Sequence, residues 1–332
     1  MCITCWKERG GPWEVYKSLR SRAMSLSHPT PSSQYCSRNM KAPIQSSHTI
    51  ATAPETTLQV LTSLPSSVNT KPTILFIHFW GGSTRTFGAL AARLGADFPL
   101  ILPALRGWGA STGPADPAAY KIIDNADDIK ALVAHLQADR ALTDGGLFQH
   151  GLVLVAHSMG AKIAQVLAAR GDLGGLLKGL ILIGPAPLGR LDLPAEMREQ
   201  QITAYSSRES AELALTYVLL GSDVGANELR LLVDDCVGGS EQARTAWPKY
   251  GTREDYEGLV FAENGRAEIR IPVEVVVGGL DKIETAERVD ERVVQVLKKA
   301  GASVTVTVLE GVGHLMPVET PEQLEVIVRK FT

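Results

Sequence analysis

The chain has 332 residues, of which 45% are hydrophobic, and a formal net charge of −3. Lysine and arginine almost balance aspartate and glutamate, and no basic cluster is interleaved with aromatic residues, which argues against a nucleic-acid partner. No apolar run approaches the roughly 18 residues of a membrane span, so we expect a soluble protein with one large core, with or without an insertion.

Residues 1–45 have no hydrophobic periodicity and are rich in serine, proline and arginine. We interpret them as a disordered tail, or as an over-extended gene model whose start is Met40. A mitochondrial presequence is the alternative, but Glu8 and Glu14 and the missing amphipathic pattern count against it. We therefore expect a cytoplasmic protein, or a mitochondrial one if residues 1–45 are a real presequence.

The four cysteines do not form a disulfide framework, because Cys2, Cys5 and Cys36 lie in the tail and Cys236 is far away. Cys2 and Cys5 have the spacing of a metal or redox pair. No second pair accompanies them, so we disfavour that interpretation and expect a reducing compartment.

Regular structure is predicted from about residue 46, first as two short strands at 47–52 and 56–63, with a turn at Pro54-Glu55. An apolar strand at 73–79 follows, and Ser83 is expected to cap the next helix. A further strand at 99–105 leads to a helix that starts at Asp116-Pro117. The apolar stripe of that helix is Ile122, Ala126, Ile129, Val133 and Leu136.

The apolar run 152–155 is typical of a buried parallel strand, and a helical pattern stopped by Gly171 comes directly after it. Another buried strand is predicted at 179–184. Strands that alternate with helices predict an α/β fold with a mostly parallel sheet, covered on both faces.

The alternation stops between about 188 and 265, where helices are predicted at 195–206, 210–220 and 227–233. We interpret residues 188–265 as a helical lid inserted into a core made of 46–187 and 266–332. In the second part of the core, strands at 272–277 and 303–309 flank a helix. A last helix opens at Thr320-Pro321, which has capping-box spacing.

The turn between the strand and the helix carries Ala156-His157-Ser158-Met159-Gly160. A serine at such a tight turn is held exposed at a helix N-terminus, and the residues two before and two after it must be small. Ala156 and Gly160 meet that need. The pentapeptide alone is a weak signal, but its context predicts a nucleophile elbow with Ser158 as the nucleophile.

In a sheet of this kind, functional residues gather at the carboxyl ends of the strands. The strand at 73–79 ends in His78-Phe79-Trp80-Gly81-Gly82-Ser83. An acyl-transfer enzyme needs two backbone N–H groups for its oxyanion, one in this loop and one just after the nucleophile. We assign them to Trp80 and Met159.

The next strand end, residues 106–113, is also rich in glycine, which suggests dinucleotide binding. The spacing is wrong for that, no helix opens there, and Pro114 and Pro117 interrupt the turn. We reject this interpretation and expect no cofactor.

A nucleophilic serine needs an imidazole base, and the imidazole needs a carboxylate on its other nitrogen. Asp281 and His314 follow the last two predicted strands, in the chain order Ser, Asp, His. We therefore predict a catalytic triad of Ser158, Asp281 and His314. Asp192, some eight residues past its strand, and Glu284, expected inside a helix, are weaker candidates for the acid.

The other histidines, His135, His150 and His157, fit structural or surface roles. No metal-ligand motif is present, so we predict no metal.

Over residues 47–332 the chain resembles the α/β-hydrolase superfamily. The motifs that carry the resemblance are the loop 78–83, Arg106-Gly107-x-Gly109-x-Ser111, the elbow at Ser158, and the strand ends 278–281 and 311–314. Relatives usually have His-Gly where this chain has His78-Phe79, and an acidic residue where it has Ala104. The relatives with an aspartate nucleophile are disfavoured by Ser158.

These observations predict a lidded serine hydrolase for a small or medium apolar carboxylic ester or lactone, with a small-molecule substrate as its partner. Phe79, Trp80, Met159, Tyr217 and Trp247 are the expected substrate-binding residues. C–C bond hydrolysis, amide or peptide cleavage, perhydrolysis, cofactor-free oxygenation and a non-catalytic receptor stay open, as does a homodimer. A peptidase would need acidic lid residues, for which the candidates are Glu196, Glu199, Asp223, Asp234 and Asp235.

Overall fold

The computed structural model describes residues 46–66, 69–260 and 269–332. The predictions for residues 1–45, including Met40, Cys2, Cys5 and Cys36, lie outside the described residues. The predicted boundary at 265/266 also lies outside them.

In the described part of the chain, eight strands form one sheet in the order β1-β2-β4-β3-β5-β6-β7-β8. Pairing is antiparallel between β1 and β2 and between β2 and β4, and parallel from β4 to β8. The strands are β1 (Ser46–Ala53), β2 (Thr56–Ser63), β3 (Thr73–Ile77), β4 (Leu100–Pro103), β5 (Leu152–His157), β6 (Leu177–Ile183), β7 (Pro272–Gly278) and β8 (Ser303–Leu309).

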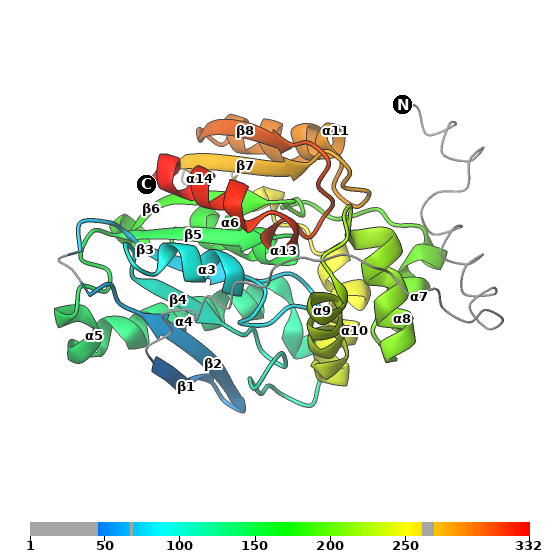
Figure 1. The fold of residues 1–332 in the computed structure, drawn as a ribbon, viewed down its shortest axis with the longest axis horizontal. Helices are drawn as coiled ribbons and strands as arrows, with labels where there is room; N and C mark the ends of the chain where they lie inside the picture. Colours follow the sequence, from blue (N-terminus) through cyan, green and yellow to red (C-terminus); the bar gives the residue numbers. More distant parts are fainter. Residues whose placement is uncertain (1–45, 67–68, 261–268) are drawn as a thin grey trace.

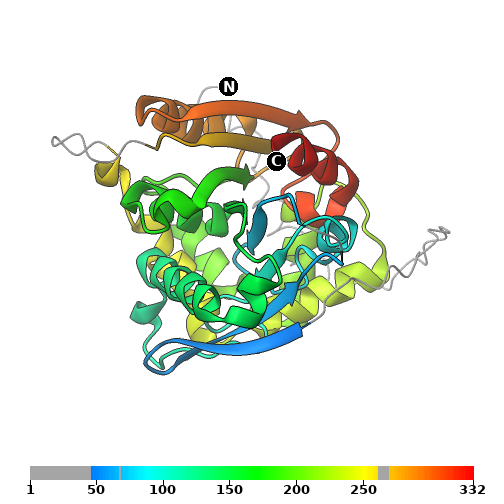
Figure 2. The same ribbon diagram turned by 90° about the vertical axis from the view of Figure 1, so that its left-hand side faces the viewer.

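Helices cover both faces of this sheet (Figures 1 and 2). The α-helices before β7 are α3 (Gly88–Leu94), α4 (Ile122–Ala138), α5 (Arg140–Asp144), α6 (Met159–Arg170), α7 (Ala195–Ala204), α8 (Arg208–Ala214), α9 (Ala226–Gly238) and α10 (Glu241–Lys249). Those after β7 are α11 (Ala286–Val289), α12 (Gln295–Lys299), α13 (Met316–Glu319) and α14 (Pro321–Phe331). The predicted α/β fold with a mostly parallel sheet is confirmed.

The core has a hydrophobic layer on each face of the sheet. One layer joins α3 and α14 to the sheet, and the other joins α4, α6 and α12 to it. Every residue of β3, β5 and β4 is buried, which explains their unbroken apolar sequences. β8 is an edge strand and is largely exposed, including its residues Val306 and Val308.

Several predicted boundaries are wrong in detail. Ser83 does not cap α3, whose N-cap is Phe87; the Ser83 hydroxyl instead accepts a hydrogen bond from the Arg85 N–H in the loop before the helix. Thr320 precedes Pro321 at the start of α14, but its side chain makes no cap hydrogen bond. The helix expected from Asp116 is split at Lys121 into a 3-10 turn (Pro117–Tyr120) and α4, because Lys121 is extended.

Three further elements were not foreseen from the sequence. α10 was missed because it contains Pro248, which normally ends a helix. A π-helical turn, Leu215–Leu219, continues α8 where an ordinary helix was expected. Another, Asp290–Val294, lies between α11 and α12.

A buried ion pair holds the glycine-rich loop after β4. The Arg106 Nε donates to Asp128 Oδ2 of α4 at 2.6 Å, and the Arg106 guanidinium also donates to the carbonyls of Ala119 and Asp124. Thr52 of β1 donates to the other Asp128 oxygen at 2.6 Å. The arginine motif is therefore structural here, because it joins β1, β4 and α4.

Helices α7–α10, here called the helical segment, lie between β6 and β7 in the chain and beyond the carboxyl ends of the parallel strands, on the right in Figure 1. Strand-end loops bond to it directly: the Trp80 indole donates to the Arg244 carbonyl at 3.0 Å, and the Ser240 N–H donates to the Gly107 carbonyl at 2.8 Å.

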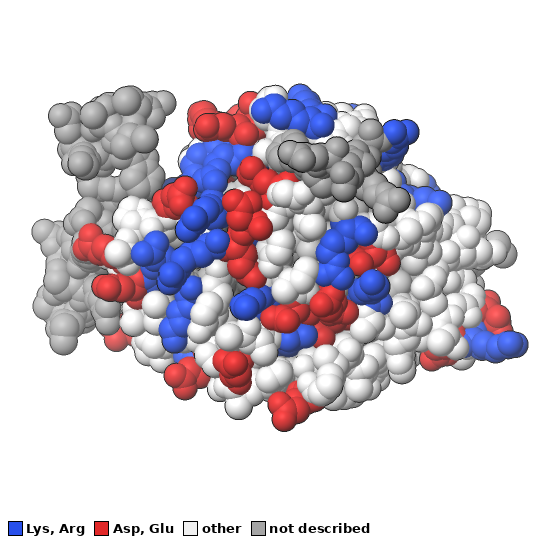
Figure 3. All heavy atoms as spheres, turned by 180° about the vertical axis from the view of Figure 1, so that it is seen from behind, with Lys and Arg blue, Asp and Glu red and all other residues white. Residues whose placement is uncertain are grey.

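Acidic and basic side chains are interspersed on the face of the molecule drawn in Figure 3, as the small net charge suggests. Within the described ranges, no helix is both long and apolar enough to cross a membrane.

Candidate active site

Ser158 occupies the sharp turn between β5 and α6. Its φ of 55° and ψ of −115° are strained for a residue with a side chain, as an elbow requires. A Cβ on Gly160 would lie 2.4 Å from the Ile77 carbonyl oxygen and 2.6 Å from that of His78. Only glycine therefore lets α6 approach the end of β3 this closely.

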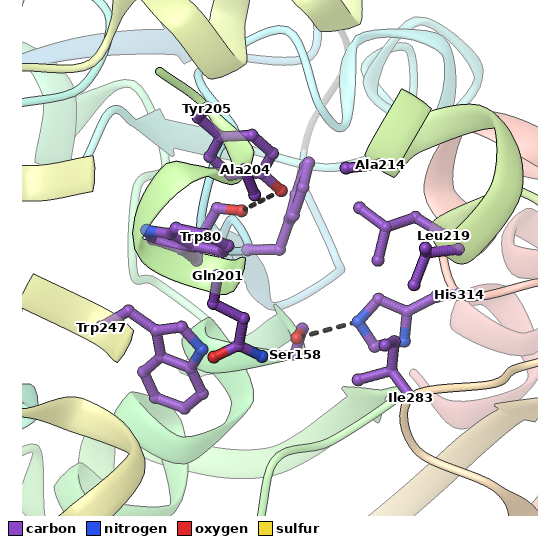
Figure 4. Close-up of a pocket in the computed structure, with 12 residues that line it drawn as sticks. Trp80, Ser158, Gln201, Ala204, Tyr205, Ala214, Leu219, Trp247, Ile283 and His314 are labelled. Carbon is purple, nitrogen blue, oxygen red and sulfur yellow. Dashed lines mark hydrogen bonds between the residues drawn. The ribbon is translucent and has the colours of Figure 1, made fainter. Parts of the chain in front are cut away.

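His314 lies within hydrogen-bond distance of both Ser158 and Asp281. The His314 Nε2 is 2.9 Å from the Ser158 Oγ (Figure 4). Its Nδ1 is 2.7 Å from Asp281 Oδ2. Because the carboxylate can only accept, Nδ1 carries the proton and Nε2 is left to accept the serine proton. This arrangement suits an activated serine nucleophile.

Asp281 is fixed by its own loop. Its Oδ1 accepts hydrogen bonds from the backbone N–H groups of Ile283 and Glu284, at 2.8 and 3.0 Å. The other two candidates for the acid are placed differently: Asp192 is exposed beside Arg190, and Glu284 is buried in the loop before α11, not inside a helix as expected.

Both backbone polar groups of His314 are hydrogen-bonded. Its N–H donates to the Leu219 carbonyl at 2.7 Å, and its carbonyl accepts from the His157 Nε2 at 2.8 Å. Glu319 Oε2 accepts from the N–H groups of Gly313 and Gly221, and its Oε1 accepts from that of Leu315. The imidazole is thus positioned by α13 and by the helical segment together.

Burial and neighbouring charge set the ionisation of the site. Burial lowers the pKa of His314, but the Asp281 charge and hydrogen bond outweigh it, and the net pKa is raised above 6.5. Burial raises the pKa of Glu284 to about 7, with a further contribution from Asp281. Burial lowers the pKa of His157 well below 6.5, so this histidine is neutral.

The loop after β3 brings Trp80 to the site. Burial lowers the pKa of His78 to about 4, and the neutral ring joins this loop to the next: its Nδ1 donates to the Phe79 carbonyl and its Nε2 accepts from the Leu105 N–H. The backbone N–H groups of Trp80 and Met159 make no hydrogen bond to another described residue. Met159 is the first residue of α6, where helix geometry leaves such N–H groups unused.

A cavity of about 490 Å³, including the space open to solvent, lies over Ser158. Ser158 and His314 line it, together with Trp80, Tyr205, Gln201 and Trp247. The rest of its lining is apolar and consists of Phe79, Ala204, Ala214, Val218, Leu219 and Ile283.

Of the expected substrate-binding residues, Phe79, Trp80 and Trp247 line this cavity, whereas Met159 and Tyr217 do not. The Tyr217 side chain is 40% exposed. It lies in the π-helical turn, of which Val218 and Leu219 line the cavity and Tyr217 does not.

Sequence reasoning missed Gln201, His157 and Glu319. Gln201 precedes Ala204 and Tyr205 by three and four residues, so the three share a helix face, but the polar sequence of α7 does not show which face is covered. His157 adjoins the serine and was assigned a structural role without its contact to His314. No sequence signal points to Glu319.

The acidic residues of the helical segment do not line the cavity. Asp235 pairs with Arg85, Asp234 pairs with Arg208, and Asp223 accepts from the Gly225 N–H. In residues 46–66, 69–260 and 269–332, no three His, Cys, Asp or Glu side chains are grouped so as to hold a metal ion.

A family model described as "Alpha/beta hydrolase family" matches residues 74–325. None of the curated proteins compared with the chain matches it.

Solved structures match over most of their length. An esterase from Exiguobacterium antarcticum is 17% identical with a TM-score of 0.70, covering 85% of this chain and 98% of its own. A thermophilic esterase from Thermogutta terrifontis is 22% identical with a TM-score of 0.65, and the match covers 86% of this chain and 97% of the esterase. A bromoperoxidase from Bacillus anthracis is 16% identical with a TM-score of 0.68, and the match covers 86% of this chain and 99% of the bromoperoxidase. At these identities, and with different chemistries among the matches, the likeness is one of fold.

Proposed function

The chain belongs to the alpha/beta hydrolase family, and within that family we propose that it is a serine hydrolase of small or medium neutral carboxylic esters or lactones. The observation that carries the proposal is the unbroken hydrogen-bond chain from Ser158 Oγ through His314 to Asp281 at the floor of a cavity. The mostly apolar lining of this cavity favours an apolar substrate.

In the proposed reaction, the Ser158 Oγ attacks the ester carbonyl carbon while its proton passes to the His314 Nε2. The N–H groups of Trp80 and Met159 stabilise the oxyanion of the tetrahedral intermediate. His314 then returns the proton to the leaving alcohol, which breaks the C–O bond and leaves an acyl-enzyme. Water, activated by the same imidazole, releases the acid and restores Ser158.

We further propose that residues 188–265 act as a lid over the core formed by 46–187 and 266–332. Support comes from the cavity, since Gln201, Ala204, Tyr205, Val218 and Trp247 all belong to the helical segment or its turns. The absence of an acidic side chain among the described lining residues counts against a peptidase, which must bind a substrate amine.

The first test is labelling of the purified protein with a fluorophosphonate probe, followed by hydrolysis of p-nitrophenyl esters of rising acyl length. Ser158→Ala should remove labelling and lower turnover by at least about 10⁴-fold, because the nucleophile is lost. Ser206→Ala, at an exposed serine, is the matched control and should behave as wild type.

Retained turnover in pure Ser158→Ala protein would overturn the proposal. A wild type that is neither labelled nor active, but is stabilised by ligands, would indicate a binding protein instead.

A further inference from the structure

The polar side chains of the cavity fall into two groups, and this division bears on what the substrate looks like. Three of them are already engaged: the Trp80 indole donates to the Arg244 carbonyl, the Tyr205 hydroxyl donates to the Trp80 carbonyl at 3.2 Å, and Ser158 is bonded to His314. Each of these groups therefore already uses its only donor hydrogen, and the Ser158 hydroxyl is reserved for the reaction itself.

Gln201 and Trp247 form the second group. Neither the Gln201 amide nor the Trp247 indole N–H bonds to another described residue, and the Gln201 Oε1 is fully buried. Gln201 comes from α7 and Trp247 from α10, and both line the cavity over Ser158. In Figure 4 the Gln201 amide points into the cavity on the side of Trp247, across from Leu219 and Ile283.

A buried amide oxygen without a partner, such as the Gln201 Oε1, costs free energy unless a ligand or water satisfies it. An amide offers both donor and acceptor whichever way it is turned, and the indole adds a second donor. Together they match an oxygen atom on the substrate. Among the described residues that line the cavity, His314 is the only one that can carry a charge near neutral pH, so that oxygen belongs to a neutral group.

We propose that Gln201 and Trp247 form a polar subsite that binds a second, neutral oxygen of the substrate, such as an ether, hydroxyl or keto oxygen, beside the scissile ester. The apolar part of the substrate then lies toward Leu219 and Ile283. This inference rests on the proposed ester hydrolysis and narrows its substrate class to oxygenated neutral esters.

The test uses two pairs of esters in which an oxygen replaces one methylene at nearly constant shape. On the acyl side, p-nitrophenyl methoxyacetate is compared with p-nitrophenyl butanoate. On the alcohol side, 2-methoxyethyl butanoate is compared with n-butyl butanoate. The measured quantity is the ratio of kcat/KM for the oxygenated ester to that for its partner, and intrinsic reactivity cancels when this ratio is compared between variants.

In Gln201→Leu, the ratio should fall about tenfold for at least one pair, as expected for one lost hydrogen bond that leaves the substrate oxygen unpaired. Trp247→Phe removes the N–H but keeps an aromatic ring, and should lower the same ratio. Gln200→Leu is the matched control, since the neighbouring residue does not line the cavity, and it should leave both ratios unchanged.

A merely structural role would lower the kcat/KM of both esters of a pair together and leave the ratio constant. An unchanged ratio for both pairs in variants that are folded and labelled by fluorophosphonate overturns the inference, and Trp247→Phe decides alone if Gln201→Leu does not fold. A labelled wild type that hydrolyses neither oxygenated ester also overturns it, while the proposed function stands. A wild type that is not labelled and hydrolyses no ester removes the proposed function and the inference together.

Discussion

At the scale of single residues, the orientation of His314 depends on groups that take no part in the chemistry. Glu319 is the centre of this arrangement: its carboxylate accepts from three backbone N–H groups, at Gly221, Gly313 and Leu315, and from the Ser222 hydroxyl. The backbones of Gly221 and Gly313 touch so closely that a Cβ on Gly313 would lie 2.2 Å from the Gly221 nitrogen. Glu319 therefore joins the histidine loop to the helical segment.

Replacing Glu319 with Gln should lower kcat by about 10- to 100-fold, with a smaller effect on KM, because one acceptor oxygen becomes a donor and the imidazole shifts from its working position. Steady-state kinetics and the rate of fluorophosphonate labelling measure this. Glu322→Gln, which removes the charge of an exposed carboxylate that pairs with Arg93, is the control. Equal activity of the two variants would contradict a positioning role for Glu319.

The pH dependence of the reaction should follow His314, which must be neutral to act as a base. Its pKa is raised above 6.5, so kcat/KM should rise with pH through a value above 6.5. The Glu284 charge contributes to that raised pKa, and Glu284→Gln should move this acid limb to lower pH. Glu287→Gln, at an exposed residue of α11, is the control and should leave the acid limb of the kcat/KM profile in place. An acid limb that moves to higher pH in Glu284→Gln would refute the explanation.

At the scale of elements, the junction of β5 and α6 requires that the helix start directly against the end of β3. α6 is buried along almost its whole length and ends cleanly at Gly171, which is left-handed with a φ of 66°. The strained Ser158 persists because the surrounding sheet and helix fix the backbone on both sides.

Gly160→Ala should lower the free energy of unfolding by about 1–3 kcal/mol and reduce activity, since the new methyl group meets backbone oxygens that cannot move without shifting the Phe79-Trp80 loop. Urea unfolding and ester hydrolysis check both effects. Gly175→Ala is the control, because a Cβ there meets no atom within 4 Å. An active Gly160→Ala variant of wild-type stability would show that the elbow is less constrained than its contacts indicate.

At the scale of the whole molecule, Lys162 joins the core to both ends of the helical segment. It lies on α6, four residues after Ser158, and is fully buried. Its ammonium donates to the carbonyls of Gly189, Gly251 and Glu254, at 2.9, 3.4 and 2.6 Å. The chain therefore leaves the core before α7 and returns to it after α10 beside the same buried Lys162 ammonium group.

Lys162→Met should lower the free energy of unfolding by about 1–3 kcal/mol, because buried carbonyls lose their donor. Burial lowers the pKa of Lys162 to about 8, against about 10.5 in the unfolded chain. Between these values the unfolded state binds more protons, so this residue makes the wild type gain stability as pH rises, and Met should abolish that contribution.

Urea unfolding at pH 7.5 and 9.5 measures both quantities. Lys130→Met, which removes a half-exposed partner of Asp172, should change stability by about 0–1 kcal/mol and is the control. A Lys162→Met variant with the stability of the wild type and the same dependence of stability on pH would rule out this role of Lys162.

Much of the fold could be predicted from the sequence because its signals are local. The buried strands β3, β5 and β6 and the helices α4 and α6 follow from apolar runs and periodicity, and the alternation of elements implies a parallel sheet. Ser158, Asp281 and His314 could be chosen because each lies in the turn or loop that follows a strand, and the carboxyl ends of parallel strands meet at one edge of the sheet. Their catalytic roles stay predictions until the Ser158 experiment is done.

The sequence by itself therefore determined the order of the strands, the α/β architecture and the three residues that meet over the sheet. Only the tertiary structure decided which side chains of the helical segment face Ser158: Gln201 and Trp247 do, and Tyr217 does not. The physical reason is that the direction of a lid side chain depends on how short helices pack on distant segments, and on one π-helical turn that the local pattern does not encode. Contacts such as those of Glu319 with Gly221, 98 residues away, carry no periodic signal in the sequence.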